Sequence, residues 1–125
     1  MYGSEDNREL HVAAPQLVTY PVTLTNSLST IFTPDSKRPV VISHILICNT
    51  DSSARTCDLA LNDGSTDYYF MNGYAMNANT SHKADGLDHY FIALKDGWTL
   101  KGVASATNVV DIFICVYEEQ GRRVT

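Results

Sequence analysis

The chain has few of the features that mark nucleic-acid binding, secretion or membrane insertion. Nine Lys and Arg stand against fourteen Asp and Glu among 125 residues, giving a formal net charge of -5. Domains that bind nucleic acid usually carry a basic patch, so we expect no direct contact with nucleic acid. No apolar run approaches the roughly 18 residues of a membrane-spanning helix, and the N-terminal residues lack the apolar segment of a signal peptide. We therefore expect a soluble protein that is made in the cytoplasm and has no membrane contact.

Cysteine is also scarce, with only Cys48, Cys57 and Cys115 in the chain. The number is odd, and each cysteine lies inside a segment with the pattern of a β-strand. The preference of cysteine for protein interiors predicts three buried free thiols. A bridge between Cys48 and Cys57 is conceivable across a hairpin, but a cytoplasmic setting argues against it.

The histidines lack the spacing of a metal site. The chain contains no HxxxH or HExxH sequence and no cysteine pair two residues apart. His44 lies among Ile and Leu, where a structural histidine with one hydrogen-bond partner is the expected role. His82 and His89 flank Asp85 and Asp88, and a loose metal site there is the alternative. We expect no metal and no cofactor.

Catalytic motifs are missing as well. There is no GxSxG sequence and no glycine-rich loop that precedes a helix and could hold phosphate. Paired carboxylates for glycoside hydrolysis could come from Asp58, Asp63, Asp67 or Asp111. Asp58 and Asp111 belong to alternating strands, in which a solvated charge is the default. The sequence therefore predicts a protein that is not an enzyme.

What the chain does contain is the pattern of β-strands. Residues 40–48 form an uncharged, nearly continuous aliphatic run, which suggests a strand buried on both faces. After a polar turn, residues 56–62 alternate, with Cys57, Leu59 and Leu61 on one face. This strand-turn-strand unit is typical of a β-sandwich.

Similar patterns recur along the chain, and no window supports an amphipathic helix of three turns. Pro21 predicts that the first strand is an edge strand or is split into two pieces. We predict an antiparallel β-sandwich of about eight strands, jelly-roll-like in preference to immunoglobulin-like. The further strands are expected at residues 17–25, 28–33, 68–71, 74–77, 89–94, 98–105 and 109–117. The domain should span residues 17–118, between a polar arm at 1–16 and a charged tail at 119–125.

Two strands are apolar on both faces. In the last strand Val110, Ile112, Ile114 and Val116 form one face, and Asp111, Phe113, Cys115 and Tyr117 form the other. In the first long strand, strict alternation places Val41, Ile45 and Ile47 opposite Val40, Ile42, Leu46 and Cys48. A two-sheet sandwich buries only the inner face of each strand. The second face therefore needs a cover, either from the chain's own segments or from another subunit.

Aromatic residues offer candidates for such a contact. The middle of the chain holds a cluster that either packs in the core and loops or forms a surface for a partner or a sugar. The candidate partner-contact residues are Tyr68, Tyr69, Phe70, Tyr74, Phe113 and Tyr117.

Four segments carry a resemblance to a known class of proteins. They are PVVISHILICNT at 39–50, DSSARTCDLAL at 51–61, GWTLKGVAS at 97–105 and VVDIFICVYE at 109–118. Over residues 30–118 the chain resembles small β-sandwich virion structural proteins of tailed bacteriophages. Two departures stand out. The middle segment is longer and more aromatic than that pattern, and Gly102 stands where an aliphatic residue is expected.

The resemblance implies a structural role in the virion. It implies a capsid decoration (cement) protein that binds the major capsid protein and forms a homo-oligomer, or else a component of the neck, tail or baseplate. A different reading of the aromatic residues is a carbohydrate-binding β-sandwich module in which Tyr68, Tyr69, Tyr74 and Trp98 stack on sugar rings.

Overall fold

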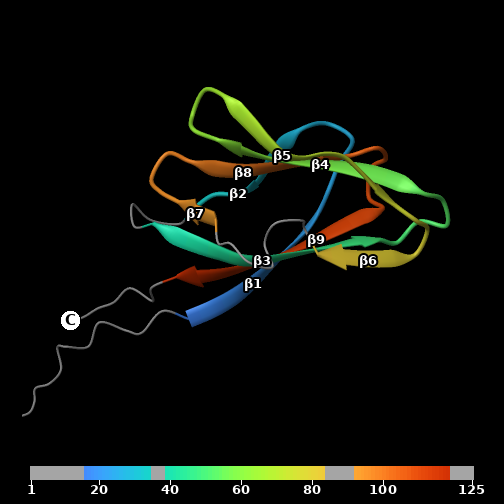
Figure 1. Cartoon of the computed structure of the whole chain (residues 1–125), viewed down its shortest axis with the longest axis horizontal. Helices are drawn as coiled ribbons and strands as arrows, with labels where there is room; N and C mark the ends of the chain where they lie inside the picture. Colours follow the sequence, from blue (N-terminus) through green and yellow to red (C-terminus); the bar gives the residue numbers. More distant parts are fainter. Residues whose placement is uncertain (1–15, 35–38, 84–91, 119–125) are drawn as a thin grey trace, which may run out of the picture.

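The computed structural model describes residues 16–34, 39–83 and 92–118, and they form two antiparallel sheets packed face to face (Figure 1). The first sheet has the order β1-β9-β3-β6, and β7 also pairs with β3. Its strands are β1 (Gln16–Thr23), β9 (Val110–Glu118), β3 (Val40–Asn49), β6 (Thr80–Lys83) and β7 (Ile92–Leu94). The second sheet has the order β2-β8-β4-β5. Its strands are β2 (Ser29–Phe32), β8 (Thr99–Ala104), β4 (Arg55–Asn62) and β5 (Asp67–Met76). The predicted antiparallel β-sandwich is confirmed, with nine strands in the described residues where about eight were expected.

The strand-turn-strand unit is not a hairpin, because β3 and β4 belong to different sheets. The chain crosses between the sheets directly after Asn49, a fully buried residue. The Asn49 side-chain amide donates to the carbonyl oxygens of Ser53 at 3.0 Å and Asn77 at 3.1 Å, and its oxygen accepts from the Asp51 N–H at 3.0 Å. These bonds satisfy the polar groups of a chain that leaves one ladder and enters another. Cys48 and Cys57 accordingly lie in different sheets, and both are free thiols.

A β-bulge in β3 changes which of its residues face the core. The register with β9 shifts between Ile42 and His44, so the successive residues Ile42 and Ser43 are both buried, followed by Ile45 and Ile47. Strict alternation, which paired Val41 with Ile45, was wrong because the extra residue inverts the phase. The expected burial on both faces was also wrong, since Leu46 is 42% exposed.

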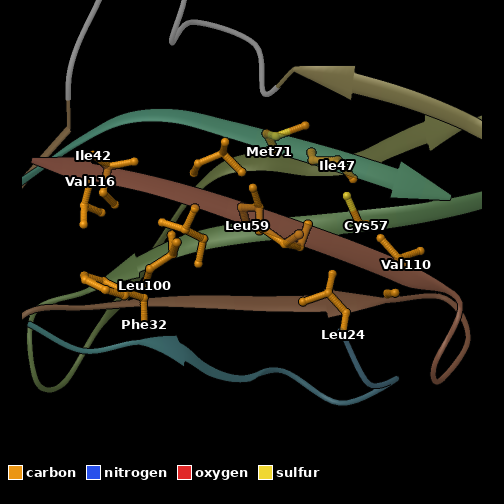
Figure 2. Packing of buried hydrophobic residues seen from close by; sticks show 14 of the residues in the cluster. Leu24, Phe32, Ile42, Ile47, Cys57, Leu59, Met71, Leu100, Val110 and Val116 are labelled. Carbon is orange, nitrogen blue, oxygen red and sulfur yellow. The ribbon is translucent and has the colours of Figure 1, made fainter. Parts of the chain in front are cut away.

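The core fills the space between the two sheets (Figure 2). The alternation predicted for the last strand is confirmed, because Val110, Ile112, Ile114 and Val116 are all fully buried. Gly102 lies in β8 on the inner face, where a Cβ would approach side-chain carbons of Leu24 at 3.0 Å and of Ile31 and Leu59 at 3.2 Å. An aliphatic residue is absent from this position because its neighbours already occupy the volume.

Other strand boundaries differ from those predicted. β5 is one strand of ten residues where two short ones were expected, and β6 was not predicted. The edge position predicted from Pro21 is confirmed for β1. Gln16, assigned to the arm, is the first residue of β1, whereas residues 1–15, 119–125 and 84–91 lie outside the described residues. Among the described residues, no helix is long and apolar enough to cross a membrane.

Candidate partner-contact surface

The side of β1, β9 and β3 that points away from the core carries exposed apolar side chains, and we call it the outer face. Phe113 and Tyr117, two of the predicted contact residues, lie on it. They are 36% and 43% exposed, whereas their neighbours Ile112, Ile114 and Val116 are fully buried. The alternation of β9 thus turns these two aromatic side chains outward.

The strand register places further apolar residues beside them. Tyr117 lies opposite Leu17 on β1 and Val41 on β3. Phe113 lies opposite Pro21 on β1 and Leu46 on β3. Directly opposed side chains in an antiparallel pair are in contact distance, so these residues form two rows across three strands. Leu17 is 53% exposed.

The middle of the outer face carries no carboxylate, lysine or arginine side chain. Between the two apolar rows lie Thr19, Cys115 and His44, which are register partners across the three strands. The Thr19 hydroxyl and the Cys115 thiol are 3.4 Å apart. At one end of the face the Asp111 carboxylate accepts from the Thr23 hydroxyl at 2.8 Å. His44 contacts Ser43 through Nδ1 at 3.0 Å, which agrees with the structural role expected of it.

Four of the predicted contact residues lie elsewhere, on β5 at the edge of the other sheet. Tyr68 and Tyr69 are 51% and 46% exposed. Because they are successive residues of a strand, their side chains point to opposite faces. Tyr68 stacks on Trp98 with a centroid distance of 6.2 Å and an interplanar angle of 17°, and its hydroxyl donates to Asp63 at 3.3 Å. The two tyrosines therefore do not form the shared flat platform that sugar stacking needs.

Phe70 and Tyr74 are only partly exposed and pack against the core. The Tyr74 ring meets the His82 ring edge-on at 5.4 Å, and its hydroxyl lies 2.9 Å from Nδ1 of His82. The other ring nitrogen of His82 lies 3.1 Å from the Thr80 hydroxyl. This network joins β5 of one sheet to β6 of the other. His82 thus contacts hydroxyl groups, while Asp85, Asp88 and His89 of the loose metal site lie outside the described residues.

The carboxylates considered for glycoside chemistry take part in local structure. Asp58 accepts from the Gly73 N–H at 2.6 Å and so holds an irregular point of β5. Asp67 accepts from the Asn62 amide at 2.7 Å. Hydrogen bonds from the N–H groups of Thr66 and Ser65 lower the pKa of Asp63 below its usual value. In the described part of the chain, no three His, Cys, Asp or Glu side chains come together as a metal site.

The buried thiol is unsuited to nucleophilic chemistry. Burial raises the pKa of Cys57 to about 11, and the nearby charge of Asp58 adds to the effect. Because only the thiolate is a good nucleophile, Cys57 is unreactive near neutral pH. Cys48 and Cys115 are partly exposed, so the prediction of buried thiols is confirmed for Cys57 alone.

A cleft opens between the edge strands β1 and β2. It has a volume of about 420 Å³ and is lined mainly by Tyr20, Val22, Ile31 and Phe32. The Tyr20 and Phe32 rings lie 5.3 Å apart, and the Tyr20 hydroxyl donates to the Glu118 carboxylate at 2.6 Å. Pro21 borders both this cleft and the outer face, so the two apolar surfaces meet at β1.

Sequence reasoning found Phe113 and Tyr117 but missed Leu17, Pro21 and Leu46 as part of the outer face. The membership of Leu17 and Pro21 depends on the pairing of β1 with β9, strands that are almost the whole chain apart. A usable signal was present, because β1 alternates between outward residues such as Leu17 and Pro21 and inward residues such as Val18 and Val22.

No protein-family model matches the chain, and no curated protein is similar to it. Among solved structures, it is similar to a pentameric capsid protein isolated from metagenomic phage sequences. The TM-score is 0.47 at 15% identity, over 91% of this chain and 69% of that one. A second pentameric capsid protein from metagenomic phage sequences gives a TM-score of 0.44 at 14% identity, over 93% of this chain and 72% of that one. Because both TM-scores are below 0.5, the similarity supports no inference about partners or oligomeric state.

Proposed function

We propose that this chain is a non-enzymatic structural protein of a tailed-bacteriophage virion, and specifically a capsid decoration (cement) protein. In this role it binds the major capsid protein and stabilises the shell. The proposal rests on the resemblance of residues 30–118 to such virion proteins and on one structural observation, the apolar outer face. The two solved phage capsid proteins are compatible with the proposal but are not used as support for it.

The outer face has the composition of a protein-binding surface. Leu17, Leu46, Phe113 and Tyr117 are each at least 36% exposed, and register places them side by side on three strands. Burying apolar surface is favourable by roughly 25 cal/mol per Å². A contiguous exposed apolar patch on a folded protein usually marks an interaction site. Docking on a coat subunit would supply the cover that this side of the sandwich lacks in the described residues.

The strand order supports a jelly-roll form of the sandwich. One sheet runs β1-β9-β3-β6 and the other β2-β8-β4-β5. The chain therefore crosses between the two sheets from β1 to β2, from β2 to β3 and from β3 to β4. Double-sheet jelly rolls of eight strands occur in viral capsid proteins, among other classes. Since a fold does not fix a function, this order adds compatibility and the outer face carries the proposal.

A binding experiment with matched variants tests the proposal. Purified protein is mixed with expanded heads of the phage whose genome encodes the chain, and bound protein is measured by co-sedimentation. We expect the wild-type chain to bind and to raise the temperature at which the heads come apart. Phe113→Asp places a charge in one of the two apolar rows of the outer face, and we expect it to weaken binding at least about tenfold. Tyr69→Asp is the control, since Tyr69 is similarly exposed but lies on the other sheet.

Each result has a defined meaning. Equal binding by the wild type and both variants would show that the outer face is not the docking surface. Binding to purified tails or baseplates but not to heads would favour the neck, tail or baseplate role. A glycan array on which the wild type binds and Tyr69→Ala does not would instead support a carbohydrate-binding module.

A further inference from the structure

The free edge of β1 is the least protected sheet edge in the described residues. β1 pairs with β9 over eight residues in one uninterrupted register, and none of the described strands pairs with its other side. The edge strands β2 and β6 have only four residues each, and β5 has two register shifts and begins with Asp67. Proteins usually protect long edges with charges, bulges or proline. β1, with the sequence QLVTYPVT, has no charge and no bulge, and its one proline is Pro21.

The hydrogen-bonding groups at this edge can be assigned from one bond. The N–H of Leu24, which continues β1, donates to the Val110 carbonyl of β9 at 2.9 Å. Alternate residues of an antiparallel strand direct their backbone groups to the same side. The backbone N–H and C=O groups that point to β9 are therefore those of Val18, Tyr20 and Val22. The N–H groups of Leu17, Thr19 and Thr23 point to the free edge, together with the carbonyl of Pro21.

Pro21 fits this assignment. It has no N–H, and at this position the missing donor lies on the free edge, so the β1–β9 ladder is complete. The proline thus weakens the free edge as a pairing surface at one point only.

The free edge lies between two apolar surfaces. On the outer side, Leu17 and Pro21 lie beside Tyr117 and Phe113. On the inner side is the cleft of about 420 Å³ lined by Val22 and residues of β2. A strand added at this edge would place alternate side chains on these two surfaces, so it should be apolar on both faces. β1 itself comes near to this composition, with Val18, Tyr20 and Val22 on one face and Leu17 and Pro21 alternating with threonines on the other.

We propose that β1 pairs antiparallel with β1 of a second copy of the chain, about a two-fold axis at Thr19. In this register Thr19 exchanges both backbone hydrogen bonds with Thr19 of the second copy. Leu17 donates to the carbonyl of Pro21 of the second copy, a bond that needs no donor on proline. Val18 then lies beside Tyr20 of the second copy on the inner side.

The distribution of charge makes β1 a more favourable place for a second copy to bind than the rest of the surface. The chain has a net charge of -5, so two copies repel one another on average. β1 carries no charged residue, so the paired strands bring no like charges face to face. The two copies would share one continuous sheet through an isologous contact. This inference does not depend on a role in the virion.

The first test is the mass of the full-length protein by light scattering after size exclusion, from micromolar to near-millimolar concentration. We expect a concentration-dependent dimer. Thr19→Pro removes the N–H at the free edge without removing a bond to β9, and we expect it to abolish the dimer. Thr19→Val keeps the N–H and is the matched control, which we expect to dimerise like the wild type. A wild type that is monomeric throughout, or a Thr19→Pro protein that dimerises equally well, would overturn the proposal.

The second test uses the wild type alone and so stays decisive if Thr19→Pro fails to fold. Amide hydrogen exchange is measured residue by residue in dilute and in concentrated samples. We expect the Leu17 and Thr19 amides to exchange at least about tenfold more slowly in the concentrated sample, and the Thr23 amide to change little. Fast exchange of Leu17 and Thr19 in a sample that is mostly dimer would refute pairing at this edge. Slow exchange already in the dilute monomer would show that a segment of the same chain occupies it.

Discussion

At the scale of the single residue, Gly102 shows how closely the core is packed. Its Cα lies on the inner face of β8, and a methyl group added there would meet Leu24 at 3.0 Å and Ile31 and Leu59 at 3.2 Å. Such distances are shorter than normal contact between carbon atoms, so the neighbours must move. Gly102 is therefore a requirement of packing, since its φ lies outside the range that favours glycine.

We predict that Gly102→Ala destabilises the fold by about 1–3 kcal/mol, the usual cost of overpacking a core. The lower entropy of the unfolded alanine chain offsets only part of this cost. Urea unfolding of the two proteins measures the difference. Leu24→Val is a useful partner, because it removes the side-chain carbon that lies nearest. In a double-mutant cycle, Gly102→Ala should cost less in the Leu24→Val background. A Gly102→Ala protein as stable as the wild type would show that the neighbours yield freely.

At the scale of the element, the links between the sheets depend on a few buried polar groups. β3 ends at Asn49, and the chain reaches β4 in the other sheet through residues 50–54. Arg55 donates to Asp51 within this link at 2.7 Å, and the hydrogen bond lowers the pKa of Asp51. Asn49 is more important, because its side chain is fully buried and makes several hydrogen bonds at the crossover.

We predict that Asn49→Ala destabilises the protein by about 3 kcal/mol, since it removes a fully buried side chain together with its hydrogen bonds to Ser53, Asn77 and Asp51. Asn62→Ala is the matched control. Asn62 also ends a strand, and its amide bonds Asp67 at 2.7 Å, but it is partly exposed and water can substitute. We expect the control to cost less than about 1 kcal/mol. Equal losses in the midpoint of urea unfolding would argue against a special role for the crossover.

The elements also show what sequence can and cannot reveal. β9 was predicted correctly because its alternation is unbroken from Val110 to Tyr117. β3 was misassigned because the bulge near Ser43 inverts the phase, and nothing in an aliphatic run marks such a residue. β6 (Thr80–Lys83) was missed because its polar sequence has no alternation, and it joins the sheet by backbone pairing with β3.

The candidate surface divides in the same way. Phe113 and Tyr117 could be identified because they interrupt the polar face of their own strand. The sequence could not show that the aromatic residues of β9 and those of β5 lie on different sheets, since this depends on which sheet each strand joins. Nor could it show the placement of Leu17 opposite Tyr117, because that placement follows from pairing between strands at opposite ends of the chain.

At the scale of the whole molecule, the two ends of the sandwich domain close onto each other. β1 pairs with β9, and β2 pairs with β8, so the first strands of the chain can pair only with strands near its end. Gln16 and Glu118, the first residue of β1 and the last residue of β9, are register partners. Chains dominated by such distant contacts fold slowly, on a scale of roughly milliseconds to seconds.

The pairing of β1 with β9 can be made local in sequence without changing any packed side chain. In a circular permutant of residues 16–118, a short Gly and Ser linker joins Glu118 to Gln16, and the chain opens in the exposed turn between Gly64 and Ser65. β9 and β1 then form a hairpin. We expect the permutant to keep the same sandwich, because its ends lie in a surface loop and its linker spans register partners.

The permutant should fold several-fold faster than the linear chain of residues 16–118, since the β1–β9 pairing no longer closes a loop of nearly the whole domain. Stopped-flow refolding followed through Trp98 fluorescence measures both rates. The unfolding rate should rise at the same time, because the cut removes the Asp63 turn and its hydrogen bonds to Ser65 and Thr66. Equal folding rates would mean that β1 and β9 pair after the rate-limiting step. In that case the other long-range pair, β2 with β8, would set the speed.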